Sequence, residues 1–252
     1  MRTTVVTGAG SGIGKALAGV LAGRGERVIG VDIRDAEVIA DLSTASGVAR
    51  MVEEVARLSG GRIDAIAAGA GVGHAPPAAV IDLNFFGAVA TLEGLRPLLA
   101  GSPAPRAAAI SSQGVRFEHD PEIVEACLRG DRDAAVKIVE AAPDNAYPAA
   151  KKALSLWIRR ESITAAWAGQ GIALNAVAPG VTVTSMTQAM LDSAEGRAFF
   201  DVHSPMALGR PAQPVEVGEV LAFLLSPAAG IVIGQTLFCD MGADATTHPM
   251  HL

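Results

Sequence analysis

The sequence is poor in aromatic and in charged side chains. Only 4% of its 252 residues are aromatic, with a single tyrosine, and 18% are charged. Half of the residues are nevertheless apolar and 28 are glycine, so the composition excludes a disordered chain and indicates a core of small and β-branched side chains. Such a composition suits buried parallel strands covered by closely packed helices.

Cysteine, basic charge and long apolar runs are also scarce. Cys127 and Cys239 lie too far apart for metal-ligand spacing, so we expect free thiols in a reducing compartment. The net charge of −6 argues against nucleic acid and against an anionic membrane surface as partners. No uninterrupted run reaches the ~18 apolar residues that span a bilayer. Because the chain begins directly with a strand pattern, we expect no signal peptide, no membrane segment and a cytoplasmic protein.

Histidine is scarce as well, with 5 residues in the chain. Two of them, His248 and His251, stand near the C-terminus and are too sparse for a metal site. We therefore expect no metal and interpret the tail, Thr246–Leu252, as a terminal extension.

Short β-branched runs alternate with helical stretches, which implies βαβ crossovers and a parallel sheet with helices on both faces. The sequence predicts strands at Thr3–Thr7, Arg27–Val31, Ile63–Ala67, Ala107–Ser111, Ile172–Val177 and Thr236–Cys239, with one strand more to be expected. It predicts helices at Lys15–Arg24, Gly47–Leu58, Ile81–Leu99 and Ala149–Ala168. The fold class is therefore α/β, a single domain over residues 1–252 with a Rossmann-like, doubly wound parallel sheet of about seven strands.

Two segments interrupt this alternation. In residues 114–145, Asp120 is an N-cap followed by proline, and Arg129-Gly130-Asp131 breaks the pattern before a second short helix near Arg132–Ala142. This segment predicts an inserted helical hairpin. Residues 184–213 form a long, apolar and partly helical stretch, which is typical of a substrate lid. Its large apolar side chains are Met186, Met190, Leu191, Phe199, Phe200 and Met206.

A glycine cluster follows the first strand and precedes a helix. Its residues are Gly8, Ser11, Gly12, Ile13 and Gly14. Glycines let the backbone turn sharply and approach a pyrophosphate, and the helix N-terminus offers free N–H groups. A glycine cluster alone is weak evidence, but this position favours a dinucleotide site. The spacing G-x-x-x-G-x-G differs from the ordinary G-x-G-x-x-G, and the sequence contains no ATPase P-loop.

The second strand is followed by Asp32, 18 residues beyond Gly14. A carboxylate there would accept hydrogen bonds from both hydroxyls of the adenosine ribose and would repel a 2′-phosphate, so the predicted cofactor is NAD. Two alternatives stay open. Asp32 could be a plain surface residue at a strand end, and Arg34 nearby would suit NADP.

Tyr147-Pro148-Ala149-Ala150-Lys151 opens a helix, with Asp144 or Asn145 as its expected cap. A spacing of four places the phenol and the ammonium on one helical face. A lysine cation beside a phenol stabilises phenolate, so we expect the pKa of Tyr147 to be lowered. Such a tyrosine acts as a general base on an alcohol or as an acid towards a carbonyl. Taken alone, the pair could also be an exposed helix face.

Two further polar residues stand where they could serve the same chemistry. Ser112 follows a strand and could hold the substrate oxygen beside Tyr147, or it could simply serve the turn. No Gly-x-Ser-x-Gly elbow surrounds it, which disfavours a serine hydrolase. Asn84, on a predicted helix, could relay protons through water to Lys151, or it could satisfy buried backbone groups.

Together these features resemble the short-chain dehydrogenase/reductase family along nearly the whole chain. Asn175-Ala176-Val177-Ala178-Pro179-Gly180 and the segment 234–242 fall in the family's order after the motifs above. The resemblance implies that Asn84, Ser112, Tyr147 and Lys151 form a catalytic tetrad. It also implies that Lys151 binds the nicotinamide ribose, that Pro179–Thr184 hold the carboxamide, and that Asp41 and Leu42 flank the adenine. The cofactor-binding residues are then Gly8, Ser11, Gly12, Ile13, Gly14, Asp32, Ile33, Asp41, Leu42, Ala70, Gly71, Tyr147, Lys151, Pro179, Gly180, Thr182 and Thr184.

The sequence departs from the family pattern in three places. Ala68-Gly69-Ala70-Gly71 stands where Asn-Asn-Ala-Gly is usual, and Ala150 replaces a common serine. Ser112 and Tyr147 are 35 positions apart, far more than is usual, because the expected hairpin lies between them. Within the family, residues 31–44 are similar to the bacterial 3α-hydroxysteroid dehydrogenase/carbonyl reductase group, which also carries a long insertion before the tyrosine.

The residues alone predict an NAD-dependent oxidoreductase that interconverts a secondary alcohol and a ketone. The resemblance implies a 3α-hydroxysteroid or a similar small apolar, steroid-like alcohol or ketone as substrate. The alternative is a non-catalytic dinucleotide-sensing or interaction protein on the same fold. Family members commonly pair through the helices that carry Asn84 and Tyr147. Because the hairpin would obstruct that face, we expect a homodimer rather than a tetramer.

Overall fold

The computed structural model describes residues 1–250, so His251 of the expected tail lies outside the described residues. Seven parallel strands form one sheet in the order β3-β2-β1-β4-β5-β6-β7. The strands are β1 (Thr3–Thr7), β2 (Arg27–Asp32), β3 (Val38–Ile39), β4 (Ala65–Ala68), β5 (Arg106–Ile110), β6 (Ala173–Pro179) and β7 (Thr236–Cys239). The predicted fold class is confirmed, and β3 is the additional strand.

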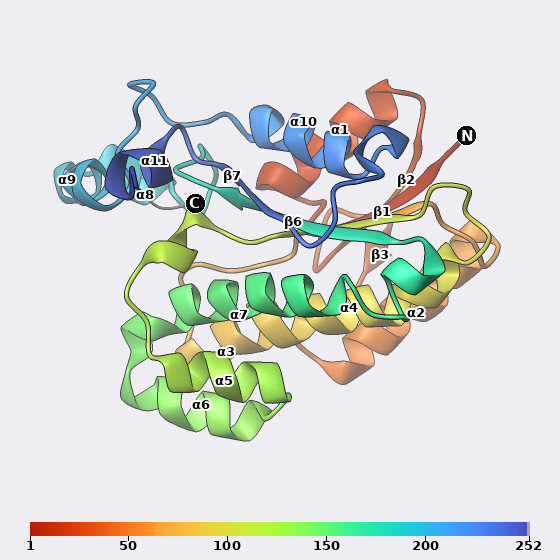
Figure 1. Ribbon diagram of the computed structural model, residues 1–252, viewed down its shortest axis with the longest axis horizontal. Helices are drawn as coiled ribbons and strands as arrows, with labels where there is room; N and C mark the ends of the chain where they lie inside the picture. The colour runs from red at the N-terminus through yellow and green to blue at the C-terminus, as the bar shows by residue number, and fades with distance from the viewer. Residues whose placement is uncertain (251–252) are drawn as a thin grey trace.

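Helices cover both faces of the sheet. The α-helices are α1 (Gly12–Gly23), α2 (Ala45–Ser59), α3 (Pro77–Ile81), α4 (Ala88–Leu95), α5 (Pro121–Arg129), α6 (Arg132–Ala141), α7 (Ala146–Glu161), α8 (Gln188–Asp192), α9 (Ala194–His203), α10 (Pro214–Leu224) and α11 (Ala243–Thr247). Figure 1 shows α1 and α10 over one face and α2, α4 and α7 over the other. The strand order reverses between β1 and β4, and open α/β sheets bind ligands beside such a reversal.

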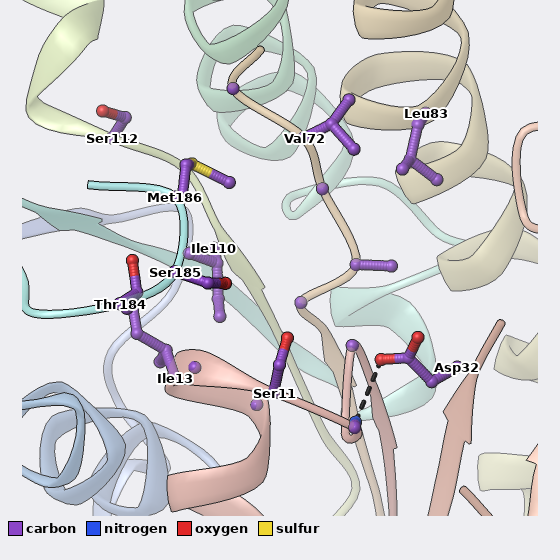
Figure 2. Close-up of a pocket in the computed structure, with 18 of the residues that line it drawn as sticks. Ser11, Ile13, Asp32, Val72, Leu83, Ile110, Ser112, Thr184, Ser185 and Met186 are labelled. Atoms are coloured by element: carbon purple, nitrogen blue, oxygen red, sulfur yellow. Dashed lines mark hydrogen bonds between the residues drawn. The ribbon is translucent and has the colours of Figure 1, made fainter. Parts of the chain in front are cut away.

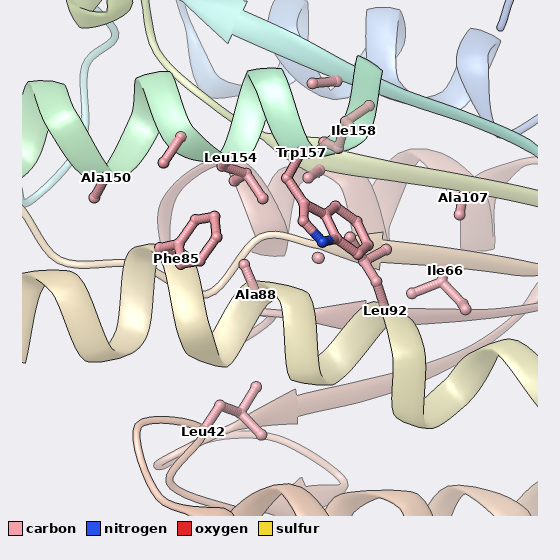
Figure 3. Close-up of a cluster of buried hydrophobic side chains, with 14 of the residues drawn as sticks. Leu42, Ile66, Phe85, Ala88, Leu92, Ala107, Ala150, Leu154, Trp157 and Ile158 are labelled. Atoms are coloured by element: carbon pink, nitrogen blue, oxygen red, sulfur yellow. The ribbon is translucent and has the colours of Figure 1, made fainter. Parts of the chain in front are cut away.

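The buried core is divided between the two faces. The cluster beneath α4 and α7 contains Phe85, Leu92 and Trp157, and Figure 3 shows these side chains between the two helices. The cluster on the opposite face is lined by Leu17 of α1 and Leu221 of α10, both fully buried. Burial of this kind stabilises the fold by about 25 cal/mol per Å² of apolar surface.

Two short helices occupy the predicted hairpin, and their caps follow the sequence. Asp120 accepts a hydrogen bond from the Glu122 N–H at 2.8 Å, and Gly130 ends α5 in the left-handed conformation at φ 76°. Asp131 then caps α6 by accepting from the Ala134 N–H at 3.1 Å. Apolar residues of both helices are buried in the cluster beneath α7, so the hairpin adds an outer layer to that face, as Figure 1 shows.

Several predicted boundaries differ from the observed ones. The helix predicted at Ile81–Leu99 begins at Pro77 and contains a π-helical turn, η1 (Asp82–Gly87), before α4. The helix predicted at Ala149–Ala168 ends at Glu161, because Trp167 folds back into the core and packs edge-on against Trp157. A short 3-10 turn, η2 (Arg96–Leu99), closes the earlier helix.

The capping of α7 also differs from the prediction. Asn145 occupies the N-cap position but makes no side-chain cap bond to the helix. Its side-chain oxygen instead accepts a hydrogen bond from the Asp120 N–H at 2.8 Å. Asn145 therefore ties the start of the hairpin to the start of α7.

One helical run in the described residues is long and apolar enough to cross a membrane by length and composition. It covers Pro77–Leu99, and half of its most apolar stretch is buried inside the protein, as in the core helix of a globular fold. Within residues 1–250, no group of three or more His, Cys, Asp or Glu side chains could hold a metal ion.

Candidate functional site

A cavity of about 480 Å³ lies at the carboxyl edge of the sheet, where the strand order reverses. It is lined by residues that follow β1, β2, β4, β5 and β6, and Figure 2 shows side chains from these segments pointing into it. Every residue of the predicted site lines this cavity except Asn84. The chain therefore brings together, at one place, motifs that span residues 8–184.

The glycine turn forms one wall of the cavity, and its backbone leaves no room for side chains. A Cβ on Gly14 would lie 2.2 Å from the Gly8 carbonyl oxygen, and one on Gly10 would lie 2.7 Å from the Arg34 carbonyl oxygen. Gly8 itself has a φ of 75°, which only glycine adopts readily. Ser11 stands at the N-cap of α1 without a side-chain cap bond. The helix thus presents free N–H groups and the positive end of its dipole to the cavity, a cradle suited to phosphate.

Asp32 lies at the end of β2 and is held in place by backbone amides. Its carboxylate accepts hydrogen bonds from the Gly10 N–H at 2.9 Å and from the Ile33 N–H at 2.7 Å. The first of these bonds is the dashed line in Figure 2. Asp32 is therefore an ordered cavity residue rather than a free surface carboxylate, and it stands where it can accept bonds from a ribose.

Asp41 and Leu42 line the far end of the same wall. Two glycines that the sequence did not single out hold them there. A Cβ on Gly47 of α2 would lie 1.9 Å from the Asp41 carbonyl oxygen, and one on Gly87 would lie 2.4 Å from the Leu42 carbonyl oxygen. Glycine inside an otherwise helical pattern is the signal that could have revealed both positions.

Ser112, Tyr147 and Lys151 form the opposite end of the cavity. A Cβ on Gly114 would lie 3.2 Å from Ser112 Oγ and 3.5 Å from the Tyr147 ring, so the serine and the tyrosine converge on this glycine. Lys151 Nζ lies 5.8 Å from the centre of the Tyr147 ring and donates a hydrogen bond to the Ile110 carbonyl oxygen at 2.7 Å. The spacing of four along α7 thus places phenol and ammonium on one face, as predicted.

Burial changes the acidity of both groups. It lowers the pKa of Lys151 to about 8, because its ammonium is buried and has no carboxylate within ion-pair distance among the described residues. It raises the pKa of Tyr147, and a hydrogen bond with Ser112 opposes this rise only in part. The expectation that Lys151 lowers the pKa of this phenol is therefore wrong for the chain alone. Desolvation raises the pKa of Tyr147 by more than the Lys151 ammonium lowers it, because that ammonium donates its hydrogen bond to the Ile110 carbonyl.

Asn84 is fully buried within η1 and bonds to the backbone of a single residue. Its side-chain oxygen accepts from the Val72 N–H at 2.9 Å, and its side-chain nitrogen donates to the Val72 carbonyl at 2.8 Å. This arrangement fixes the strand-end loop beside Lys151, since a Cβ on Gly71 would lie 2.8 Å from the Asn84 side-chain oxygen and 3.6 Å from Lys151 Nζ. Of the two roles expected for Asn84, these contacts match the satisfying of buried backbone groups.

The segment after β6 completes the cavity. Gly180 packs so closely that a Cβ would lie 2.7 Å from the Asp240 Cα, and Thr182 Oγ1 donates to the Gly180 carbonyl at 3.1 Å. Met186 lies against Gly73 across the cavity, with its side chain 2.9 Å from where a Cβ of that glycine would stand. The cavity residues that the predicted site did not include are Gly10, Arg34, Ala40, Gly69, Val72, Gly73, His74, Leu83, Ile110, Ser111, Ser185, Met186 and Thr187.

The chain is similar to known proteins over nearly its whole length. The family model described as short chain dehydrogenase matches residues 2–119, and the one described as Enoyl-(Acyl carrier protein) reductase matches residues 133–244. The 3-alpha-hydroxysteroid dehydrogenase/carbonyl reductase of Comamonas testosteroni is 37% identical, over 99% of both chains. The cis-4-hydroxycyclohexanecarboxylate dehydrogenase of Sinomonas cyclohexanicum is 32% identical, over 97% of both.

Solved structures agree with the sequence comparison. The crystal structure of the 3-alpha-hydroxysteroid dehydrogenase from Pseudomonas sp. B-0831 complexed with NADH has a TM-score of 0.93 and 36% identity, over 100% of both chains. The crystal structure of levodione reductase has a TM-score of 0.76 and 25% identity, over 97% of this chain and 98% of the other. On this similarity of sequence and structure, the chain belongs to the short-chain dehydrogenase/reductase family of oxidoreductases.

Proposed function

We propose that this oxidoreductase uses NAD to interconvert a secondary alcohol and a ketone, and that its substrate is a 3α-hydroxysteroid or a similar apolar molecule. The observation that carries the proposal is the convergence of Ser112 and Tyr147 at one end of a cavity whose other end is a glycine turn with an ordered carboxylate, Asp32.

The residues that line the cavity suit a nicotinamide dinucleotide. The glycine turn and the start of α1 would hold the pyrophosphate, and Asp32 would bind the adenosine ribose. Lys151 would bind the second ribose, while Pro179, Gly180, Thr182 and Thr184 would hold the carboxamide. The carboxylate of Asp32 favours NAD over NADP because it repels a 2′-phosphate, and a relative of 36% identity forms a complex with NADH.

The chemistry follows from the groups at the nicotinamide end. In reduction, the phenol of Tyr147 donates its proton to the carbonyl oxygen. In oxidation, the deprotonated side chain accepts the hydroxyl proton of the alcohol, and the raised pKa of this phenol in the chain alone disfavours that form. Ser112 donates a hydrogen bond to the same oxygen and holds it beside the phenol. A nicotinamide held at this end of the cavity would supply the hydride acceptor for oxidation and the hydride donor for reduction. Lys151 lies beside the phenol, and Asn84 fixes the loop that closes the site behind this lysine.

The substrate class rests on the lid and on the relatives. We propose that residues 184–213 cover the substrate, since Met186 lines the cavity and the same segment continues into α9, which carries Phe199. Two relatives named as 3-alpha-hydroxysteroid dehydrogenases align over nearly their whole length. An apolar lid suits the apolar ring system of a steroid.

We further propose a cytoplasmic homodimer. The hairpin packs on α7, so that Ile123 and Val139 are buried in the core cluster beneath it and that face is covered within one chain. Both cysteines are free, as suits a reducing compartment. Light scattering tests the assembly, and a mass of four chains would overturn the dimer.

An assay of the purified chain tests the proposed function. NAD⁺ is added with a panel of 3α-hydroxysteroids and simple secondary alcohols, and nicotinamide absorbance is followed. We expect turnover with the steroids, and loss of at least a hundredfold in kcat for Tyr147→Phe, because general acid–base catalysis contributes about 10²–10⁴-fold. Bound NADH without turnover on any panel member would favour the dinucleotide-sensing alternative, and full activity of Tyr147→Phe would exclude the proposed mechanism.

A further inference from the structure

A short 3-10 turn, η3 (Gln113–Arg116), directly follows Ser112 and makes contacts with the proposed lid. The side chain of Gln113 is 7% exposed, and its amide nitrogen donates a hydrogen bond to Ser204 Oγ at the end of α9. Ser204 is 2% exposed and lies 91 residues further along the chain. Within residues 1–250 neither side chain makes another hydrogen bond, so each depends on the other for its polar partner.

Aromatic rings strengthen the same junction. Phe117, just after η3, meets Phe199 of α9 edge-on at 6.3 Å and the His203 ring at 6.2 Å. Only Gly196 and Phe200 of the ten residues of α9 are buried, so little else holds this helix against the protein. Figure 1 shows α8 and α9 lying beyond the edge of the sheet rather than over one of its faces.

The turn that holds α9 also orients Ser112 and Tyr147. Ser112 Oγ accepts a hydrogen bond from the Gly114 N–H at 3.0 Å, and Gly114 packs against the Tyr147 ring. The far end of η3 is anchored by Arg116, which pairs with Asp244 at 2.8 Å and stacks on Phe238 at 5.3 Å. The turn is therefore held by the contacts of Gly114 and Arg116, and Gln113 contacts the end of α9.

We propose that Gln113 is a positioning residue, which docks the lid helix α9 through Ser204 and links this docking to the orientation of the Ser112 hydroxyl. The inference rests on the proposed function, in which α9 belongs to the substrate lid. A buried amide and a buried hydroxyl satisfy each other only when α9 is docked, and undocking must expose both to water. This hydrogen bond therefore favours one docked position of α9. A large substrate beneath the lid should bind more tightly when α9 is held in that position.

The test uses three variants of the full chain. Gln113→Met keeps the shape of the side chain without its polar atoms, Ser204→Ala removes the partner, and the double variant removes both. Gln188→Met is the matched control, because Gln188 is exposed on α8 and bonds only to Asp192. Hydrogen exchange of the α9 amides, read by mass spectrometry, reports docking without any substrate.

We expect α9 exchange to accelerate at least about tenfold in each single variant, since loss of one partner leaves the other buried and unsatisfied. The KM for a 3α-hydroxysteroid should rise about tenfold, which corresponds to about 1.4 kcal/mol. The KM for cyclohexanol and the Kd for NADH should change less than twofold. The double variant should be no worse than either single one, because the effects of groups in contact are not additive.

The outcomes separate the two proposals. Unchanged α9 exchange in an active Gln113→Met variant overturns the docking role alone. An equal rise in the KM for the steroid, the KM for cyclohexanol and the Kd for NADH would show general structural damage, and it would also overturn the docking role. Absence of turnover in the wild-type chain overturns the proposed function and, with it, the positioning role, whatever the exchange rates show.

Discussion

The two walls of the cavity are built in different ways. On the cofactor wall, backbone groups make the close contacts, as where Gly14 lies against the Gly8 carbonyl and the Gly10 N–H donates to the Asp32 carboxylate. The substrate wall contains Ser112, Tyr147 and Met186, and in the turn and helix that adjoin it side chains from distant segments meet, as where Gln113 reaches Ser204. The first wall depends on the absence of side chains at fixed positions, whereas the second depends on which side chains are present. Substitutions should therefore change cofactor affinity on the first wall and substrate affinity on the second.

The largest effect is expected on the cofactor wall. Gly14→Ala places a methyl group 2.2 Å from the Gly8 carbonyl oxygen, so the turn must open. We expect NADH affinity, measured by fluorescence titration, to fall at least about a hundredfold, or ~2.7 kcal/mol. Gly19→Ala in the same helix is the control, because nothing lies within 4 Å of its Cβ position. It should bind NADH normally and be as stable as the wild type or more stable. Normal NADH binding by Gly14→Ala would contradict the steric argument.

Lys151 lies beside Tyr147 in the cavity. Replacing it should lower activity but raise the stability of the fold. We expect Lys151→Met to lower kcat at least about a hundredfold. The same change should raise the free energy of unfolding at pH 7 by on the order of 3 kcal/mol, because it removes a buried charge whose pKa is lowered to about 8.

The pH dependence of this stabilisation follows from the direction of the pKa shift. Below pH 8 the lysine is protonated in both states and its burial opposes folding in full. Between pH 8 and its unfolded pKa of 10.5 the folded state releases the proton first, so the wild type gains stability as the pH rises. Urea unfolding at pH 7 and pH 9.5 should therefore show the advantage of Lys151→Met shrinking. Lys152→Met is the neighbouring control, and an unchanged difference would count against a buried charge.

Tyr147 allows a direct measurement of the electrostatics beside Lys151, because it is the single tyrosine of the chain. The absorbance of tyrosinate in the folded chain without cofactor should rise with a midpoint above 10, since burial raises the pKa of this phenol. Tyr147→Phe should show no such transition. A midpoint below 10 would mean that Lys151 dominates the site as the sequence alone suggested.

The smallest effect is expected on the substrate wall. Phe199→Ala removes a ring that is 41% exposed and meets Phe117 across the junction with α9. We expect the KM for a 3α-hydroxysteroid to rise about threefold, consistent with ~0.7 kcal/mol for an aromatic pair. NADH affinity should stay the same. Val202→Ala on the same helix, at a position 68% exposed, is the control and should be silent. A decrease in NADH affinity that exceeds the increase in KM would contradict the assignment of cofactor and substrate binding to separate walls.

The sequence was most informative where chemistry depends on local spacing. The glycine turn, the four-residue step from Tyr147 to Lys151 and the cap of the hairpin at Asp120 each concern residues within about two turns of helix. Because these local backbone preferences persist in the folded chain, the predicted hairpin and glycine turn follow from them. Asp41, Leu42 and Pro179–Thr184 were expected only from the family resemblance. Boundaries were less predictable, because Trp167 ends α7 through a contact with the core rather than through its own helix propensity.

Tertiary structure alone decided the remainder. Asn84 bonds to Val72, and Gly47 lies against Asp41, only after separate helices pack beside the strand ends. The pKa of Tyr147 is set by desolvation, which no spacing in the sequence encodes. By itself the sequence determined the order of the motifs and the elements that carry them. Packing decided how those elements enclose the phenol, because burial and contacts between distant segments arise only in the folded chain.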